Sequence, residues 1–126
     1  MVIHNNFQDF VLFLYVHIAL ADNYLHESEE SLILDKMSRL FPAETNPKKK
    51  FEEAMANYKS QGSEKIMEII RDTFKQYSHI KFTQKYKVYT DLYDIVNADG
   101  KVEESEMVAL DLLKQIIDMN SEANKK

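Results

Sequence analysis

The sequence lacks cysteine altogether and is poor in glycine and proline. Its 126 residues include no Cys, two Gly and two Pro. The absence of cysteine excludes disulfide bonds and thiolate metal sites. Because glycine and proline are the residues that most often interrupt helices, their scarcity favours long helices.

Apolar runs long enough to cross a membrane are also missing. The longest run covers residues 10–21 and contains His17, whereas a membrane-spanning helix needs about 20 apolar residues. The N-terminal segment MVIHNNFQDF lacks the cationic start of a signal peptide. We therefore expect a cytoplasmic protein that is not inserted in a membrane.

Charge is present in both signs but is unevenly distributed. Residues 1–47 contain two Lys or Arg and seven Asp or Glu, residues 48–89 ten and five, and residues 90–126 four and nine. Acidic terminal thirds repel phosphate backbones and attract cations or basic partners, so we expect no binding to nucleic acid. The middle lysines alternate with apolar residues at helical spacing, as on a solvated helix face.

The dominant pattern in the sequence is the recurrence of apolar residues at helical spacing. The length and the 44% hydrophobic content suit a single domain over residues 1–126. We expect an all-α, compact bundle of six or seven helices, with residues 119–126 as a frayed tail. The expected helices cover about residues 6–21, 27–40, 47–61, 64–77, 84–97 and 103–119.

Residue types at the expected helix ends and faces refine this outline. Asn5 or Asn6, Asn46, Ser63 and Thr83 are expected N-caps. The first helix is nearly apolar on every face, so it should lie at the centre of the bundle, with His17 as a hydrogen-bonded histidine of the core or its boundary. The stripe of Tyr86, Tyr89 and Tyr93 is interpreted as a core face, with a groove for a partner as the alternative.

A short acidic pattern occurs twice, near the two ends of the chain. ADNYLHESE, residues 21–29, aligns with ADGKVEESE, residues 98–106. Asn23 stands where Gly100 stands, and these two residue types best tolerate a positive φ. Each copy therefore predicts a helix end, a left-handed turn, one apolar residue and a new helix.

The glutamates of the pattern have an architectural interpretation. Glu29 and Glu106 fall near the third position of the following helices, where a glutamate completes a capping box and suits the helix dipole. Neither copy is a complete calcium loop of the EF-hand type. In the second copy, for example, Ile95 occupies the position of the first ligand.

A metal site is the other interpretation of the same residues. If the two copies pack about a pseudo-twofold axis, their carboxylates come together and recruit a hard cation, Ca²⁺ or Mg²⁺. The candidate ligands are Asp22, Glu29, Asp99 and Glu106, with Asn23 and Gly100 as turn residues. We predict no catalytic residue and no other cofactor, since no His-Glu-x-x-His motif, phosphate-binding loop or nucleophile elbow occurs.

These motifs resemble those of the TerB-like family of tellurite-resistance domains, which also occur in some membrane-anchored DnaJ-type co-chaperones. The resemblance spans about residues 7–119 and rests on ADGKVEESE, the degenerate ADNYLHESE and the all-helical pattern. It implies a cytoplasmic domain linked to chemical stress, with an acidic surface associated with metal binding. The motif positions are Asp22, Glu29, Asp99, Gly100 and Glu106; Asn23 departs from the glycine that the family prefers.

Three hypotheses of function follow. The first is a non-enzymatic stress-response module whose acidic corner binds a protein partner or a divalent cation. The second is a scaffolding domain that binds proteins without any metal. The third is a metal-dependent hydrolase, although no histidine is placed as a base and no lid-like loop is apparent. We expect a monomer or a weak homodimer in each case.

Overall fold

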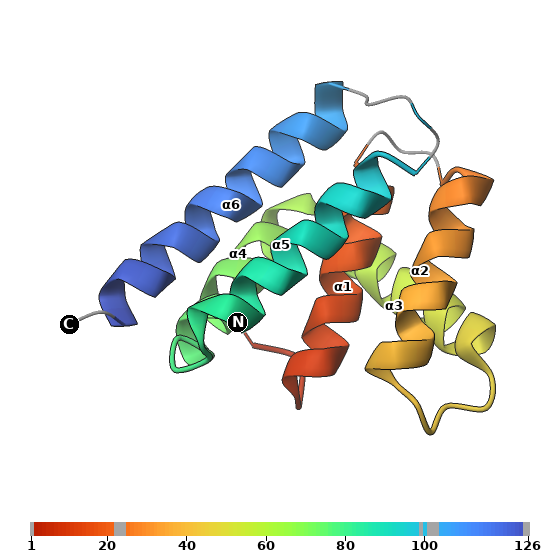
Figure 1. The fold of residues 1–126 in the computed structure, drawn as a ribbon, viewed down its shortest axis with the longest axis horizontal. Helices are drawn as coiled ribbons and strands as arrows, with labels where there is room; N and C mark the ends of the chain where they lie inside the picture. Colours follow the sequence, from red (N-terminus) through yellow and green to blue (C-terminus); the bar gives the residue numbers. More distant parts are fainter. Residues whose placement is uncertain (1, 22–24, 99, 101–103, 125–126) are drawn as a thin grey trace.

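The computed structural model describes residues 2–21, 25–98, 100 and 104–124, the stretch 119–124 as backbone only. These residues form six α-helices and no strand, which confirms the all-α prediction (Figure 1). The helices are α1 (Phe7–Ala19), α2 (Glu27–Leu40), α3 (Pro47–Gln61), α4 (Ser63–Gln76), α5 (Phe82–Val96) and α6 (Glu104–Asn124).

Two helices begin as their sequence predicts. The side chain of Asn6 accepts a hydrogen bond from the backbone N–H of Asp9 at 2.8 Å, which satisfies a free donor of the first turn of α1. Asn46 does the same for Lys49 at 3.1 Å. Pro47 follows as the first residue of α3, where its missing N–H costs no hydrogen bond.

Two other predicted caps are wrong by a residue or two. Helix α4 begins at Ser63 itself, with Gly62 as the N-cap, and α5 begins at Phe82 with Lys81 as the N-cap. Gly62 has φ +79, so one residue both ends α3 and leads into α4. Ser63 and Thr83 therefore lie inside the first turns of their helices. The last helix also differs, because α6 continues to Asn124, beyond the expected end at Met119.

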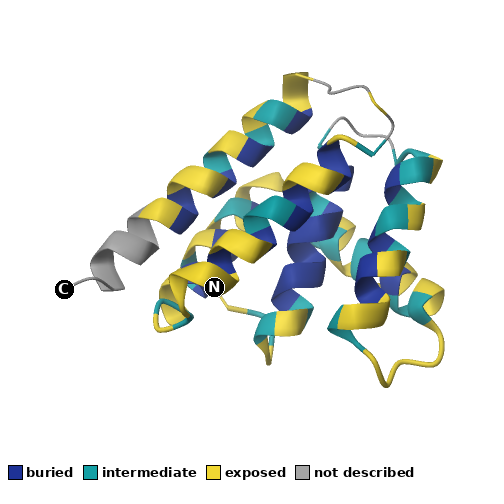
Figure 2. Ribbon diagram, in the orientation of Figure 1, coloured by how far each residue is buried: buried dark blue, intermediate teal, exposed yellow. Residues whose placement is uncertain are grey.

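Helix α1 lies at the centre of the bundle, as predicted. It packs against α2, α3, α5 and α6, and Figure 2 shows it buried along most of its length. Its apolar residues face all of these neighbours, since an α-helix distributes consecutive residues around its axis. The buried residues of α1 are Phe10, Val11, Leu12, Phe13, Leu14, Tyr15, Val16, Ile18 and Ala19.

The tyrosine stripe of α5 is not a core face, so this prediction is wrong. Tyr86 and Tyr93 are 48% and 49% exposed, and Tyr89 is half-buried. The inward face of α5 is instead formed by Val88, Leu92 and Ile95, which recur at helical spacing and are buried. The tyrosines recur at the same period on a different side of the helix.

Helix length and hydropathy also bear on the membrane prediction. None of the described helices combines the length and the apolar content that a membrane span requires.

His17 is a hydrogen-bonding histidine at the boundary of the core, as predicted. Its Nδ1 lies 2.8 Å from the hydroxyl oxygen of Tyr58 on α3. Burial lowers the pKa of His17 to about 4 and raises the pKa of Tyr58 to about 12. Both groups are therefore neutral at pH 7, and the pair joins α1 to α3.

Stability should depend on pH through His17. The unfolded chain binds a proton near the ordinary pKa of 6.5, whereas the folded chain binds it only near 4. The stabilisation by neutral His17 is therefore complete above about pH 6.5 and is lost as the pH falls toward 4, by at most about 3 kcal/mol. Urea unfolding at pH 7 and pH 4.5 should show a smaller pH dependence in His17→Gln than in the parent protein. An equal pH dependence in both proteins would contradict this assignment.

Candidate functional site

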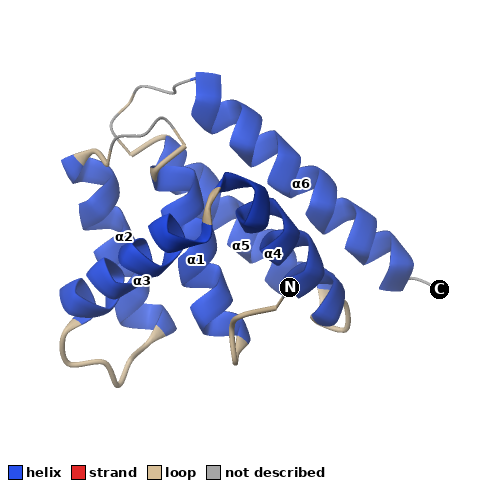
Figure 3. Ribbon diagram, turned by 180° about the vertical axis from the view of Figure 1, so that it is seen from behind, coloured by secondary structure: helices blue, strands red, loops and turns tan. Residues whose placement is uncertain are grey.

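The described helix ends that flank the two copies of the acidic motif lie toward the same end of the molecule. The first copy connects α1 to α2 and the second connects α5 to α6, and all four helix ends lie toward the upper right of Figure 1. The reverse view in Figure 3 shows the same arrangement. Helix α1 packs against α5 and α6, and α2 packs against α5, so the two corners belong to helices that contact one another.

In the first corner, α1 ends at Ala19 and its last carbonyls are used by the following residues. The N–H of Leu20 donates to the carbonyl of Val16 at 3.0 Å, and that of Ala21 donates to Ile18 at 3.2 Å. Helix α2 then begins at Glu27, and the N–H of His26 donates to Oε1 of Glu29 at 3.2 Å. Glu29 thus caps α2 as the architectural interpretation predicts.

In the second corner, Gly100 adopts the left-handed conformation that the motif predicts. Helix α5 ends at Val96, and the N–H of Asn97 donates to the carbonyl of Tyr93 at 3.1 Å. Gly100 has φ +76 and donates its N–H to the carbonyl of Asn97 at 3.1 Å. Helix α6 then starts at Glu104.

The two motif glutamates are both buried. Glu29 and Glu106 are each 1% exposed, and each is the third residue of its helix. Capping requires only contact with the backbone before the helix, and it does not require that the carboxylate lose its water. Removing a carboxylate from water is costly unless hydrogen bonds or a cation compensate for it. Equal burial of the two motif glutamates is therefore a shared feature that capping alone does not require.

The structure places two of the four predicted ligands. Asp22 and Asp99, together with the turn residue Asn23, lie outside the described residues. Within the described part of the chain, no group of three or more His, Asp or Glu side chains is arranged to hold a metal ion. Of the four predicted ligands, the described ones are Glu29 and Glu106, whose carboxylates are of the oxygen type that hard cations prefer.

Comparison with known proteins identifies the family. The sequence model described as "Tellurite resistance protein TerB" matches residues 8–126. The chain belongs to the TerB family. Searches of the curated proteins and of the solved structures gave no match. Both helix corners of this TerB domain fall inside the matched range.

A buried ion network, which sequence reasoning did not single out, joins α1, α2 and α5 of the TerB domain. The carboxylate of Asp91 accepts hydrogen bonds from Lys36 at 3.0 Å, Lys87 at 2.7 Å and the hydroxyl of Tyr15 at 3.1 Å. Lys36 also donates to Asp94 at 3.2 Å. Lys36 and Asp91 are buried, so each neutralises a charge that would otherwise lie unpaired in the interior.

The electrostatics of the network follow from burial and from these hydrogen bonds. Burial raises the pKa of Asp91, but the hydrogen bonds and charges of Lys87 and Lys36 outweigh it, so the net pKa lies below its ordinary value. Burial, together with the negative Asp91, raises the pKa of Tyr15 far above its ordinary value. Asp91 is therefore ionised and Tyr15 protonated at neutral pH.

The sequence does contain a signal for the network. Lys36 lies three residues after Ile33 and Asp91 three after Val88, so each charge shares the inward face of its helix with a buried residue. Opposite charges at apolar positions of two helices indicate a buried pair.

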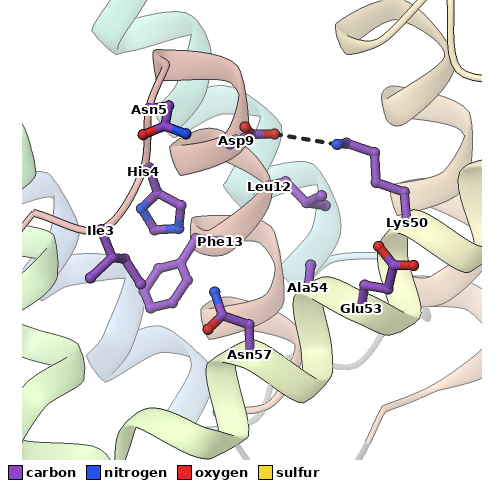
Figure 4. A pocket seen from close by; sticks show the side chains of 10 residues that line it. All are labelled: Ile3, His4, Asn5, Asp9, Leu12, Phe13, Lys50, Glu53, Ala54 and Asn57. Atoms are coloured by element: carbon purple, nitrogen blue, oxygen red, sulfur yellow. Dashed lines mark ion pairs between the residues drawn. The ribbon is translucent and has the colours of Figure 1, made fainter.

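A second polar region lies where the N-terminal segment meets α3. It forms a hollow of about 240 Å³, whose lining side chains are drawn in Figure 4. Asp9 and Lys50 of this lining are paired at 3.4 Å. The ring of His4 packs edge-on against Phe13 with centroids 4.8 Å apart. Burial lowers the pKa of His4, and the charge of Asp9 only partly opposes this. His4 is therefore a packed ring whose pKa lies below its ordinary value, and Asp9 is paired with Lys50.

The left-handed turn of the second corner can be tested by substitution. We expect Gly100→Ala to lower the free energy of unfolding by about 1 kcal/mol, because a side chain at φ +76 is strained. The loss should come from the backbone alone, since no atom lies within 4 Å of the added Cβ. Gly100→Asn should lose less, because asparagine tolerates this conformation. Equal losses for both variants in urea unfolding would contradict the assignment.

Proposed function

We propose that this TerB domain is a non-enzymatic interaction module whose two acidic corners together bind one divalent cation, Ca²⁺ or Mg²⁺. The observation that carries the proposal is the equal burial of Glu29 and Glu106 at matched positions of α2 and α6. The ends of the four helices that carry the motifs lie toward one end of the bundle, which supports the proposal that carboxylates far apart in the sequence share one ion.

The chemistry of the donors supports a hard cation. Carboxylate oxygens are the ligands that Ca²⁺ and Mg²⁺ prefer, and a bound cation offsets the cost of burying carboxylates. The chain contains no cysteine, and His17 is engaged with Tyr58. The proposed ligand set includes Asp22 and Asp99, the motif aspartates that the family resemblance implies.

The absence of enzymatic activity is part of the proposal. Two histidines, His4 and His17, have pKa values that burial lowers, and both pack against aromatic rings. A catalytic base at neutral pH needs instead a pKa near the working pH and access to substrate. The family description links such domains to tellurite resistance, and we propose a role in the response to chemical stress.

Protein docking without a metal is the second candidate function. It is favoured by a row of aromatic rings on α5, of which Phe82 and Tyr86 are exposed and Tyr89 is half-buried. The ring centroids of Phe82 and Tyr86 are 5.8 Å apart, and those of Tyr86 and Tyr89 are 5.9 Å apart. Exposed aromatic side chains are enriched at protein interfaces. If this candidate is correct, the glutamates of the acidic corners act only as helix caps.

Isothermal titration calorimetry separates the two candidates. The parent protein should bind Ca²⁺ or Mg²⁺ with one ion per chain. The variant Glu29→Gln/Glu106→Gln should bind at least about tenfold more weakly, because it removes two charged ligands and keeps their size. Glu52→Gln/Glu64→Gln, which changes two exposed glutamates on α3 and α4, provides the matched control and should bind as the parent does.

Two results would remove the metal from the proposal. One is no saturable heat with either ion, and the other is equal affinity in the corner variant and the parent. Circular dichroism of each variant before the titration shows that the helices are intact, which matters because Glu29 caps α2.

A further inference from the structure

A pocket of about 240 Å³ opens between α1, α2 and α5, next to the buried ion network. One wall is apolar and is formed by Phe7, Val11, Leu40 and Val88. Phe7 begins α1 and Leu40 ends α2, whereas the acidic corner lies between the end of α1 and the start of α2. The pocket is therefore separate from the acidic corners.

Cationic side chains form another part of the lining, the cationic wall. Lys36, Arg39 and Lys87 line the pocket together with a single carboxylate, that of Asp91. Asp91 already accepts hydrogen bonds from Tyr15, Lys36 and Lys87, so it presents little free charge to a ligand. The lining as a whole carries an excess of positive charge.

The cations keep unused hydrogen-bond donors. An ammonium group has three N–H donors and a guanidinium group has five. The described hydrogen bonds of Lys87 and Arg39 are one each, to Asp91 and to Asp35. Asp35 is exposed and lies outside the pocket lining, where water weakens its hold on Arg39. Lys87 and Arg39 are thus able to donate to an anion at the mouth.

We propose that this pocket binds a small amphipathic carboxylate. Its apolar body would lie against Val11, Leu40 and Val88, and its carboxylate would receive hydrogen bonds from Lys87 and Arg39. A bare inorganic anion would leave the apolar wall in contact with water, and a neutral apolar molecule would leave the cations unused. The volume restricts the ligand to a body smaller than those of ordinary drug-sized ligands.

Hexanoate is a suitable probe, and methyl NMR of the full chain in a buffer free of divalent cations is a suitable measurement. We expect saturable shifts of the Val11 and Val88 methyl signals with hexanoate, and binding of hexan-1-ol at least about tenfold weaker, because hydrogen bonds to a charged group contribute more than neutral ones. Since no divalent cation is present, the result is independent of the corner site.

Paired variants test the cationic wall. Arg39→Gln/Lys87→Gln should weaken hexanoate binding by about tenfold or more, whereas Lys65→Gln/Arg71→Gln, with the same change in net charge on exposed residues of α4, should leave it unchanged. Arg39→Gln alone, which removes an exposed side chain bonded to Asp35, should show part of the loss even if the double variant folds poorly. Equal binding of hexan-1-ol, no saturable shift, or equal affinity in the two double variants would overturn the proposal.

Discussion

Helix α1 has apolar side chains around its whole circumference, and burying all of them requires helices on several sides. Helices α2, α3, α5 and α6 supply this cover. Helices α1 and α5 pack together and both run toward the same end (Figure 1), so their C-terminal ends lie at the same end of the bundle. The placement of both acidic corners toward one end is thus a consequence of how the core is covered.

The buried ion network fixes how three of these helices meet. Apolar packing tolerates small shifts between helices, but a buried charge that loses its partner is strongly destabilising. Asp91 on α5 is held by Lys36 of α2 and Tyr15 of α1. The network therefore sets the position of α5. This helix carries the second corner at one end, and its side helps line the pocket that we propose binds a carboxylate.

Local features were the predictable part. Asn6 and Asn46 cap their helices as expected, and Gly100 takes the turn that its alignment with Asn23 indicates. Features that depend on tertiary packing were not predictable in the same way. Lys36 and Asp91 are 55 residues apart, and the tyrosines of α5 repeat at helical spacing whether they face inward or outward. For the candidate site, the sequence identified Glu29 and Glu106 but not their burial.

The central claim is that the two corners form one cation site. Mn²⁺, a paramagnetic ion that also prefers oxygen ligands, tests it by localised broadening of amide NMR signals. The account predicts that Gly100 and the first turns of α2 and α6 lose intensity together at low Mn²⁺, while the turn at Gly62 keeps its intensity. Broadening at one corner alone, or broadening spread evenly over the chain, would contradict it.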